Sequence, residues 1–234
     1  MNLKELTVII PTKNEEKNII SFLDSLPKHL KLLVVDSSTD RTRELIQIQR
    51  PQNTEVFFEE CNIPRARQIG ADNASTEWLL YSDCDMIFDK MYFENLEKME
   101  IREKLGEIMG GKHSLKKYKW YYRFYSFNMM FFSWFTIPVG SGSNMILRKK
   151  ALQQIGGFDF SLSHSEDSDI LWRIRKAGWK IKFNRNLKVY ETDHRRLDAG
   201  MFKKFWHGGL RAFFLITGIN KKSVQSSDWG YWDK

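Results

Sequence analysis

Cysteine is scarce in this sequence, and its scarcity excludes several classes of small protein. Cys61 and Cys84 are the two cysteines among 234 residues. Two cysteines cannot form a disulfide-rich scaffold, and these two match no zinc-ligand spacing. We therefore expect a reduced, cytoplasmic environment, with a single disulfide as the alternative.

Long apolar segments are missing as well. The longest apolar stretch, residues 129–139, is interrupted by Ser133, Thr136 and Pro138. It falls short of the roughly 20 residues that a membrane-spanning helix needs. Residues 1–6 lack the apolar region of a secretory signal. We expect one domain with appended segments that does not span a membrane.

Positive charge and aromatic residues are abundant and unevenly placed. The formal net charge is +8, and aromatic residues make up 14% of the chain. The aromatic excess lies in residues 120–135 and 202–214. A basic protein suits an anionic partner, which could be nucleic acid, phospholipid headgroups or a nucleotide phosphate, and charge alone does not choose among them.

The first ninety residues alternate short apolar runs with amphipathic stretches, which is typical of βα units around a mostly parallel sheet. The expected strands are residues 6–10, 32–36, 55–58 and 78–82. They are apolar at consecutive positions, so helices should flank both faces of the sheet. Asn14 is expected to cap the helix that carries Ile19, Leu23 and Leu26. The sequence thus predicts an α/β fold.

The second half is less regular. We expect a strand at residues 143–147, helices at 149–155 and 166–177, and a turn at 156–159. Gly178 would end the second of these helices.

Acidic residues follow the predicted strands at positions where ligands bind in open α/β sheets. This rule groups residues 11–15, 36–40 and 83–85 into one site. Asp83 and Asp85 could hold Mg²⁺ or Mn²⁺, or else cap a helix beside a solvated neighbour. Asp36 could accept hydrogen bonds from a base or ribose, or cap the following helix.

Four further residues carry candidate chemistry. Arg67 could pair with phosphate or lie on the surface. Glu166 and Asp167 could favour the first turn of a helix, or act as a general base. His194 could ligate a metal, respond to pH or lie on the surface.

Six short motifs in order resemble family 2 glycosyltransferases with the GT-A fold. They are Pro-Thr-Lys-Asn-Glu-Glu (11–16), Asp36 with its Ser-Thr-Asp-Arg-Thr (38–42), Ala-Arg-x-x-Gly (66–70), Asp83/Asp85, Gly-Gly-Phe-Asp (156–159) and Glu166-Asp167. The resemblance covers roughly residues 6 to 195. It implies a Rossmann-like sandwich, a nucleotide-sugar donor such as a UDP- or GDP-sugar, a divalent metal (Mn²⁺ or Mg²⁺), and inverting transfer. Ser37-Ser38 departs from the Asp-Gly that relatives often have there, which puts the loop geometry in doubt.

The resemblance also implies individual roles. Pro11, Thr12, Asn14 and Glu15 would form the first nucleotide loop, Asp36 would contact the base, and Arg67 the base or diphosphate. Asp85 would ligate the metal, with Asp83 at the ribose or a metal-bound water and His194 completing the site. Asp167 would be the catalytic base, with Glu166 supporting the acceptor.

We divide the chain accordingly into a catalytic domain at 1–199 and an amphipathic C-terminal segment at 200–234. Residues 1–112 would bind the donor, and 113–199 would bind the acceptor and supply the base. In residues 201–216 aromatic and cationic side chains fall on opposite faces, which suits an anionic membrane surface or packing on the domain. We expect peripheral contact at the cytoplasmic face and a glycan or polyprenyl-linked lipid acceptor, without nucleic acid.

Two other functions fit parts of the pattern. A sugar-phosphate nucleotidyltransferase also pairs acidic metal ligands with an α/β domain, but its first loop is usually rich in glycine. A non-enzymatic basic module that binds membrane or nucleic acid would leave the acidic residues at strand ends unexplained. A retaining transfer on the same fold also stays open, and the sequence does not indicate the oligomeric state.

Overall fold

The structure of the chain is a computed structural model that describes residues 1–134, 140–162, 166–198 and 200. A short 3-10 helix (Leu3–Glu5) precedes the first strand. The strands are β1 (Leu6–Thr12), β2 (Lys31–Asp36), β3 (Thr54–Phe58), β4 (Trp78–Tyr81), β5 (Met86–Phe88), β6 (Leu105–Ser114), β7 (Met145–Arg148) and β8 (Lys180–Glu191). The helices are α1 (Ile19–Asp24), α2 (Thr42–Gln49), α3 (Ile63–Asn73), α4 (Tyr92–Glu97), α5 (Lys119–Trp134), α6 (Lys149–Gln154), α7 (Glu166–Lys176) and α8 (Arg195–Asp198).

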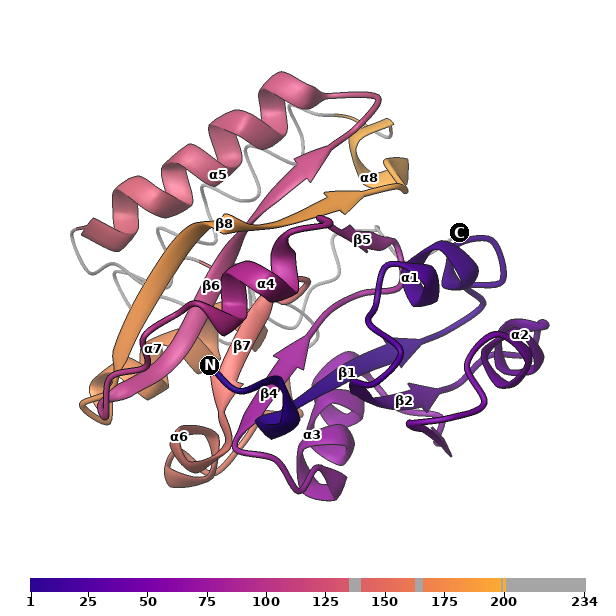
Figure 1. Cartoon of the computed structure of the whole chain (residues 1–234), viewed down its shortest axis with the longest axis horizontal. Helices are drawn as coiled ribbons and strands as arrows, with labels where there is room; N and C mark the ends of the chain where they lie inside the picture. The colour runs from indigo at the N-terminus through magenta and orange to yellow at the C-terminus, as the bar shows by residue number, and fades with distance from the viewer. Residues whose placement is uncertain (135–139, 163–165, 199, 201–234) are drawn as a thin grey trace.

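These strands form one mixed sheet in the order β3-β2-β1-β4-β7-β6-β8-β5 (Figure 1). Strands β3, β2, β1 and β4 run parallel, as predicted. Strand β7 is antiparallel to both β4 and β6, and it therefore joins the parallel part to the second half. The carboxyl ends of β1, β2 and β4 meet at one edge, where their loops follow.

Helices cover both faces of the parallel part, as the continuous apolar runs predicted. The core on one face joins Val8 and Val34 to side chains of α1, α2 and α4. On the other face Ile9 and Leu33 pack with α3, α6 and α7. The α/β fold with a mostly parallel sheet flanked by helices is confirmed.

The second half is more regular than its sequence indicates. Strands β6 and β8, which were not expected, pair in parallel over much of their length. The strand predicted at 143–147 begins two residues later, at Met145. The expected amphipathic helix at 201–216 lies outside the described residues.

Membrane-spanning helices are absent from the described ranges. None of the helices there is both long and apolar enough to cross a bilayer.

Helix α3 approaches β1 very closely, and Gly70 allows this. A Cβ atom at Gly70 would lie 2.3 Å from Cγ2 of Ile9, well inside van der Waals contact. The glycine of the Ala-Arg-x-x-Gly motif is therefore required by packing. Its neighbour Arg67, one turn earlier on α3, is held near the carboxyl ends of the strands as a result.

We expect Gly70→Ala to lower the free energy of unfolding by about 1–3 kcal/mol, because the added methyl group overpacks the core. Urea denaturation measures this loss. The Ile9→Ala/Gly70→Ala pair should cost less than the two single changes summed, because the shortened Ile9 makes room. Asp72→Ala, at an exposed α3 position, is the control. A Gly70→Ala midpoint equal to that control would contradict the close approach.

Candidate active site

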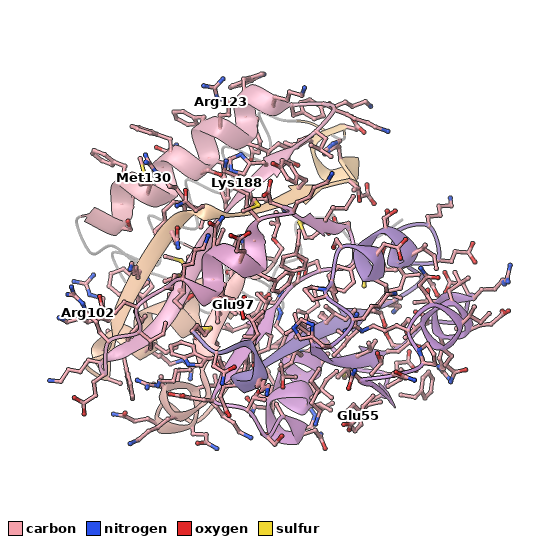
Figure 2. The ribbon with its side chains drawn as sticks, viewed as in Figure 1. Glu55, Glu97, Arg102, Arg123, Met130 and Lys188 are labelled. Atoms are coloured by element: carbon pink, nitrogen blue, oxygen red, sulfur yellow. The ribbon has the colours of Figure 1, made fainter. Side chains whose placement is uncertain are left out.

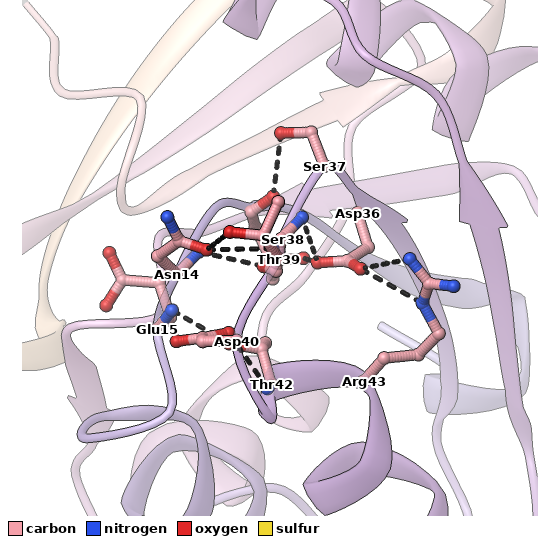
Figure 3. Close-up of polar contacts among 10 residues, drawn as sticks. Asn14, Glu15, Asp36, Ser37, Ser38, Thr39, Asp40, Thr42 and Arg43 are labelled. Carbon is pink, nitrogen blue, oxygen red and sulfur yellow. Dashed lines mark hydrogen bonds and ion pairs between the residues drawn. The ribbon is translucent and has the colours of Figure 1, made fainter.

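The loop after β2 is organised around the buried carboxylate of Asp36. Its Oδ1 accepts hydrogen bonds from Thr12 Oγ1 (2.6 Å) and Ser38 N (3.2 Å). Its Oδ2 accepts from the Arg43 guanidinium at 3.2 Å (Figure 3). The alternative that Asp36 caps α2 is wrong, because Asp40 accepts from Thr42 N at that helix start. Asp36 joins the first two loops, and its contact with a base stays a prediction.

The first loop is tied to the second through Asn14. The Asn14 backbone has φ of 56°. The Asn14 side-chain oxygen accepts from Thr39 N at 2.9 Å, and the Asn14 backbone N–H donates to Ser38 Oγ at 2.8 Å (Figure 3). The prediction that Asn14 caps the first helix is wrong, because α1 begins at Ile19 with Asn18 at its N-cap. Asparagine tolerates this left-handed conformation, and its side chain bridges the loops instead.

Two more residues of the first loop contact its neighbours. Glu15 N donates to Thr42 Oγ1 at 2.8 Å. The Pro11 carbonyl accepts from the Cys84 thiol at a sulfur–oxygen distance of 3.9 Å. The three predicted loops therefore lie together at one edge of the sheet.

Asp83 and Asp85 lie in different surroundings after β4. The Asp83 side chain is 40% exposed and pairs with Arg67 at 3.2 Å. Asp85 is half-buried, and its Oδ1 is buried without a hydrogen-bond partner among the described residues. Burial raises the pKa of Asp85, while the nearby Lys112 charge acts in the opposite direction. Asp85 thus presents a buried acceptor that lacks a donor.

Arg67 brings the two halves of the chain together. Its Nη1 donates to Glu166 Oε1 at 2.7 Å, and its Nη2 donates to Asp83 Oδ1 at 3.2 Å. The Arg67 side chain is 3% exposed. Burial opposes its charge, but Glu166, Asp83 and Asp167 outweigh burial and raise the pKa of Arg67. The surface interpretation of Arg67 is therefore wrong.

Gly142 makes room for this guanidinium and also orients Asp167. A Cβ at Gly142 would lie 2.4 Å from Arg67 Nη1. The Gly142 N–H donates to Asp167 Oδ2 at 2.9 Å, while Asp167 Oδ1 accepts from Ser168 N at 2.6 Å. Asp167 is in the first turn of α7, where the helix dipole favours a carboxylate. Burial raises the pKa of the adjacent Glu166, against the lowering effect of Arg67.

His194 is buried in a polar cluster beside the acidic loop. Tyr122 donates its hydroxyl hydrogen to Glu191 Oε2 at 2.5 Å, and the Tyr122 hydroxyl oxygen lies 3.3 Å from His194 Nδ1. A phenol has one hydrogen, so Nδ1 must be the donor in that contact. Nε2 then carries the lone pair, and it accepts from Ser114 Oγ at 3.1 Å. The surface interpretation of His194 is wrong, and metal ligation stays a prediction.

The site fits a divalent cation through Asp85. Within the described ranges, no three His, Cys, Asp or Glu side chains are grouped so that they could hold a metal ion. The buried oxygen of Asp85 has no hydrogen-bond donor, so a bound cation would stabilise its negative charge. Carboxylate oxygens are ligands that Mg²⁺ and Mn²⁺ prefer. Ligand phosphate oxygens and water would complete such a shell.

Comparison with known proteins identifies the family. Residues 7–156 match the model of glycosyl transferase family 2. The chain belongs to this family, and its fold is the GT-A fold that the motifs implied.

Three relatives illustrate the similarity. The pre-mycofactocin glycosyltransferase of Mycobacterium tuberculosis is 20% identical over 93% of this chain and 49% of its own length. The mannosyltransferase PcManGT from Pyrobaculum calidifontis, solved with GDP-Man and Mn²⁺, has a TM-score of 0.71 at 18% identity, covering 95% of this chain and 69% of that one. S. aureus TarS 1-349, solved with UDP-GlcNAc, has a TM-score of 0.64 at 19% identity, covering 81% and 58%. This chain spans about half of the mycobacterial relative.

Sequence reasoning missed four residues of this site. They are Lys112, Ser114, Tyr122 and Glu191. All four come from β6, α5 and β8, and their contacts with Glu191 and His194 cross at least 69 residues of sequence. A charged residue directly after Gly110-Gly111 was the one local signal for a functional strand end.

Removal of Arg67 should be severely destabilising. We expect Arg67→Ala to lower the free energy of unfolding by about 3–5 kcal/mol, because Glu166, Asp83 and Asp167 lose their shared counter-charge. Urea denaturation measures the loss. Arg65 lies on the same helix as Arg67 and makes an exposed ion pair with Glu59. Arg65→Ala should cost less than about 1 kcal/mol. Equal losses in the two variants would contradict the role given to Arg67.

Proposed function

We propose that the chain is a metal-dependent glycosyltransferase that transfers a sugar from a nucleoside-diphosphate donor to an acceptor, with inversion. The main support is the convergence of Asp83, Glu166 and Asp167 on Arg67, next to the unpartnered carboxylate oxygen of Asp85. Family membership supports the same reaction class. The donor half would be residues 1–112, and residues 113–199 would bind the acceptor.

The donor is proposed to be a UDP- or GDP-sugar, bound with Mn²⁺ or Mg²⁺. One fold relative was solved with GDP-Man and Mn²⁺, and another with UDP-GlcNAc. Thr12 and Asn14 of the first loop are hydrogen-bonded to Asp36 and Ser38 of the second, which supports a shared nucleotide site formed by this loop pair. Asp85 would hold the cation, with Asp83 beside it. His194, proposed as the third ligand, would have to exchange the hydrogen bond between its Nε2 and Ser114 Oγ for the metal. A divalent ion there would neutralise charge on the leaving diphosphate.

Proton removal is proposed for Asp167. Its Oδ2 accepts from the Gly142 N–H, and the adjacent Glu166 pairs with Arg67. With a hydroxyl acceptor, the carboxylate would take up the hydroxyl proton as the oxygen attacks the anomeric carbon and the nucleoside diphosphate leaves. Glu166 would keep Arg67 in place and support the acceptor.

Donor binding is tested by thermal shift with UDP-, GDP- and dTDP-sugars, each with and without Mn²⁺. We expect one nucleotide to raise the melting temperature in the presence of metal, since a ligand of the folded state stabilises it. Asp85→Asn should abolish that shift. Asp167→Asn should keep it while lowering kcat by about 100-fold or more, because base catalysis is lost. No shift with any donor would count against the proposal.

The acceptor is proposed to be lipid-linked, for example a polyprenyl phosphate or a growing lipid-linked glycan, at the cytoplasmic face of a membrane. Support comes from helix α5, which lies on the outer side of β6 and β8 (Figure 1). Its side chains Trp120, Phe124, Phe127 and Phe131 share one helical stripe and are 39–62% exposed. Lys119 and Arg123 are also exposed on α5, and Arg123 points away from the sheet in Figure 2. Exposed aromatic rings beside cations suit an anionic lipid surface.

Membrane contact is tested by sedimentation with vesicles of phosphatidylglycerol or phosphatidylcholine. The intact chain should bind the anionic vesicles, and a Trp120→Ser/Phe124→Ser/Phe127→Ser variant should bind at least about tenfold more weakly, because apolar burial is lost. Ile48→Ser, at an exposed apolar position on α2, is the control. A second triple variant, Phe202→Ser/Trp206→Ser/Phe213→Ser, tests the segment 201–216. Equal binding by all forms, or none by the intact chain, would contradict membrane contact.

A further inference from the structure

Lys112 is a buried cation near the acidic loop that no step above uses. It lies on β6, and its Nζ is 2.9 Å from Glu191 Oε2. The two side chains are 14% and 6% exposed. A lysine is rarely enclosed in this way unless it is paired. The position therefore needs an electrostatic explanation.

The Lys112–Glu191 pair adjoins the Asp83–Asp85 loop through the backbone. Glu191 on β8 pairs with Met86 on β5, and Met86 is the residue that follows Asp85. Thr192 N donates to the Asp85 carbonyl at 2.8 Å. Although burial lowers the pKa of Lys112, the carboxylates of Glu191, Asp85 and Asp83 raise it overall. The ammonium thus lies within electrostatic reach of both candidate metal ligands.

The positive charge of Lys112 must have opposite effects on the binding of a divalent cation and on the binding of a nucleoside diphosphate. A divalent cation that approaches Asp85 alone is repelled by Lys112 and competes with it for the carboxylates. A nucleoside diphosphate brings negative charge that both cations attract. Lys112 would weaken metal binding on its own and strengthen binding of the metal–nucleotide complex.

We propose that Lys112 couples metal binding to nucleotide binding in the donor site, so that the divalent cation is held tightly only together with a nucleoside diphosphate. This inference rests on the proposed function. By linkage, the nucleotide and the cation then raise each other's affinity by the same factor. The enzyme would keep Asp85 charge-compensated between turnovers without trapping a metal ion.

The test compares Lys112→Gln with Lys112→Arg, which keeps the charge. Lys31→Gln is the matched control, because Lys31 also pairs with a glutamate, Glu55, at 3.1 Å but on the exposed surface of β2 and β3. Free Mn²⁺ is measured by electron paramagnetic resonance without nucleotide. UDP and GDP are then titrated calorimetrically in saturating Mn²⁺.

Lys112→Gln should bind Mn²⁺ alone about three- to tenfold more tightly, because a repelling charge is gone. It should bind UDP or GDP with Mn²⁺ about tenfold more weakly, because a charge-assisted contact is lost. Lys112→Arg and Lys31→Gln should stay close to the unmodified protein in both titrations. The double variant Lys112→Gln/Glu191→Gln removes one charge of each sign, so both shifts should be smaller than in Lys112→Gln. This separates the effect of charge from a loss of folding.

Parallel losses of Mn²⁺ and nucleotide affinity with a lower melting temperature would assign Lys112 a structural role and overturn the inference. Unchanged affinities in Lys112→Gln would also overturn it. If the unmodified protein binds Mn²⁺ but neither nucleotide, the proposed function fails, while the Mn²⁺ titration still decides whether Lys112 opposes the metal. If it binds no Mn²⁺ even in the presence of UDP or GDP, both proposals fail.

Discussion

The buried guanidinium of Arg67 is the interaction on which the candidate site depends. It joins Asp83, just after β4, to Glu166, at the start of α7, and its own contact with Glu166 crosses 99 residues of sequence. Without it, acidic side chains from both halves of the chain would repel one another in a nearly dry environment. Gly70 and Gly142 are required around it because one allows α3 to approach β1 and the other leaves space for the guanidinium.

Charge compensation also explains why the first loops are ordered. Asp36 is fully enclosed, yet Thr12, Ser38 and Arg43 supply donors to both of its oxygens. Asp85 differs because one of its oxygens lacks a donor among the described residues. Both carboxylate oxygens of Glu107 on β6 also lack partners among the described residues. Burial raises the pKa of Glu107, which favours the neutral acid inside the sheet. Asp85 is instead at the ligand-facing edge, where a cation could compensate its charge.

The parallel half could be predicted from the sequence because β1, β2 and β4 are buried on both faces and are mostly apolar. The position of Asp36, Asp83 and Asp85 at strand ends was then enough to indicate them as candidate ligand-binding residues. Strand β6 was missed because Gly106, Gly110 and Gly111 and the buried Glu107 weaken its strand pattern. Asn14 was misplaced because a helix cap and a loop bridge use the same side-chain oxygen.

Contacts between distant segments could not be read from local pattern. The pairing of Lys112 with Glu191 and of Tyr122 with His194 depends on β6 and β8 lying side by side, which no periodicity indicated. These contacts surround the residue proposed as metal ligand, so the least predictable part of the fold is also the part closest to the proposed chemistry.

We propose that Asp85 would hold a divalent cation together with a nucleoside diphosphate. The most direct measurement is anomalous diffraction from crystals of the protein with Mn²⁺ and either UDP or GDP. The account predicts an anomalous peak within about 2.5 Å of an Asp85 carboxylate oxygen and of a diphosphate oxygen. A nucleotide bound at the ends of β1 and β2 with no manganese beside Asp85 would contradict it.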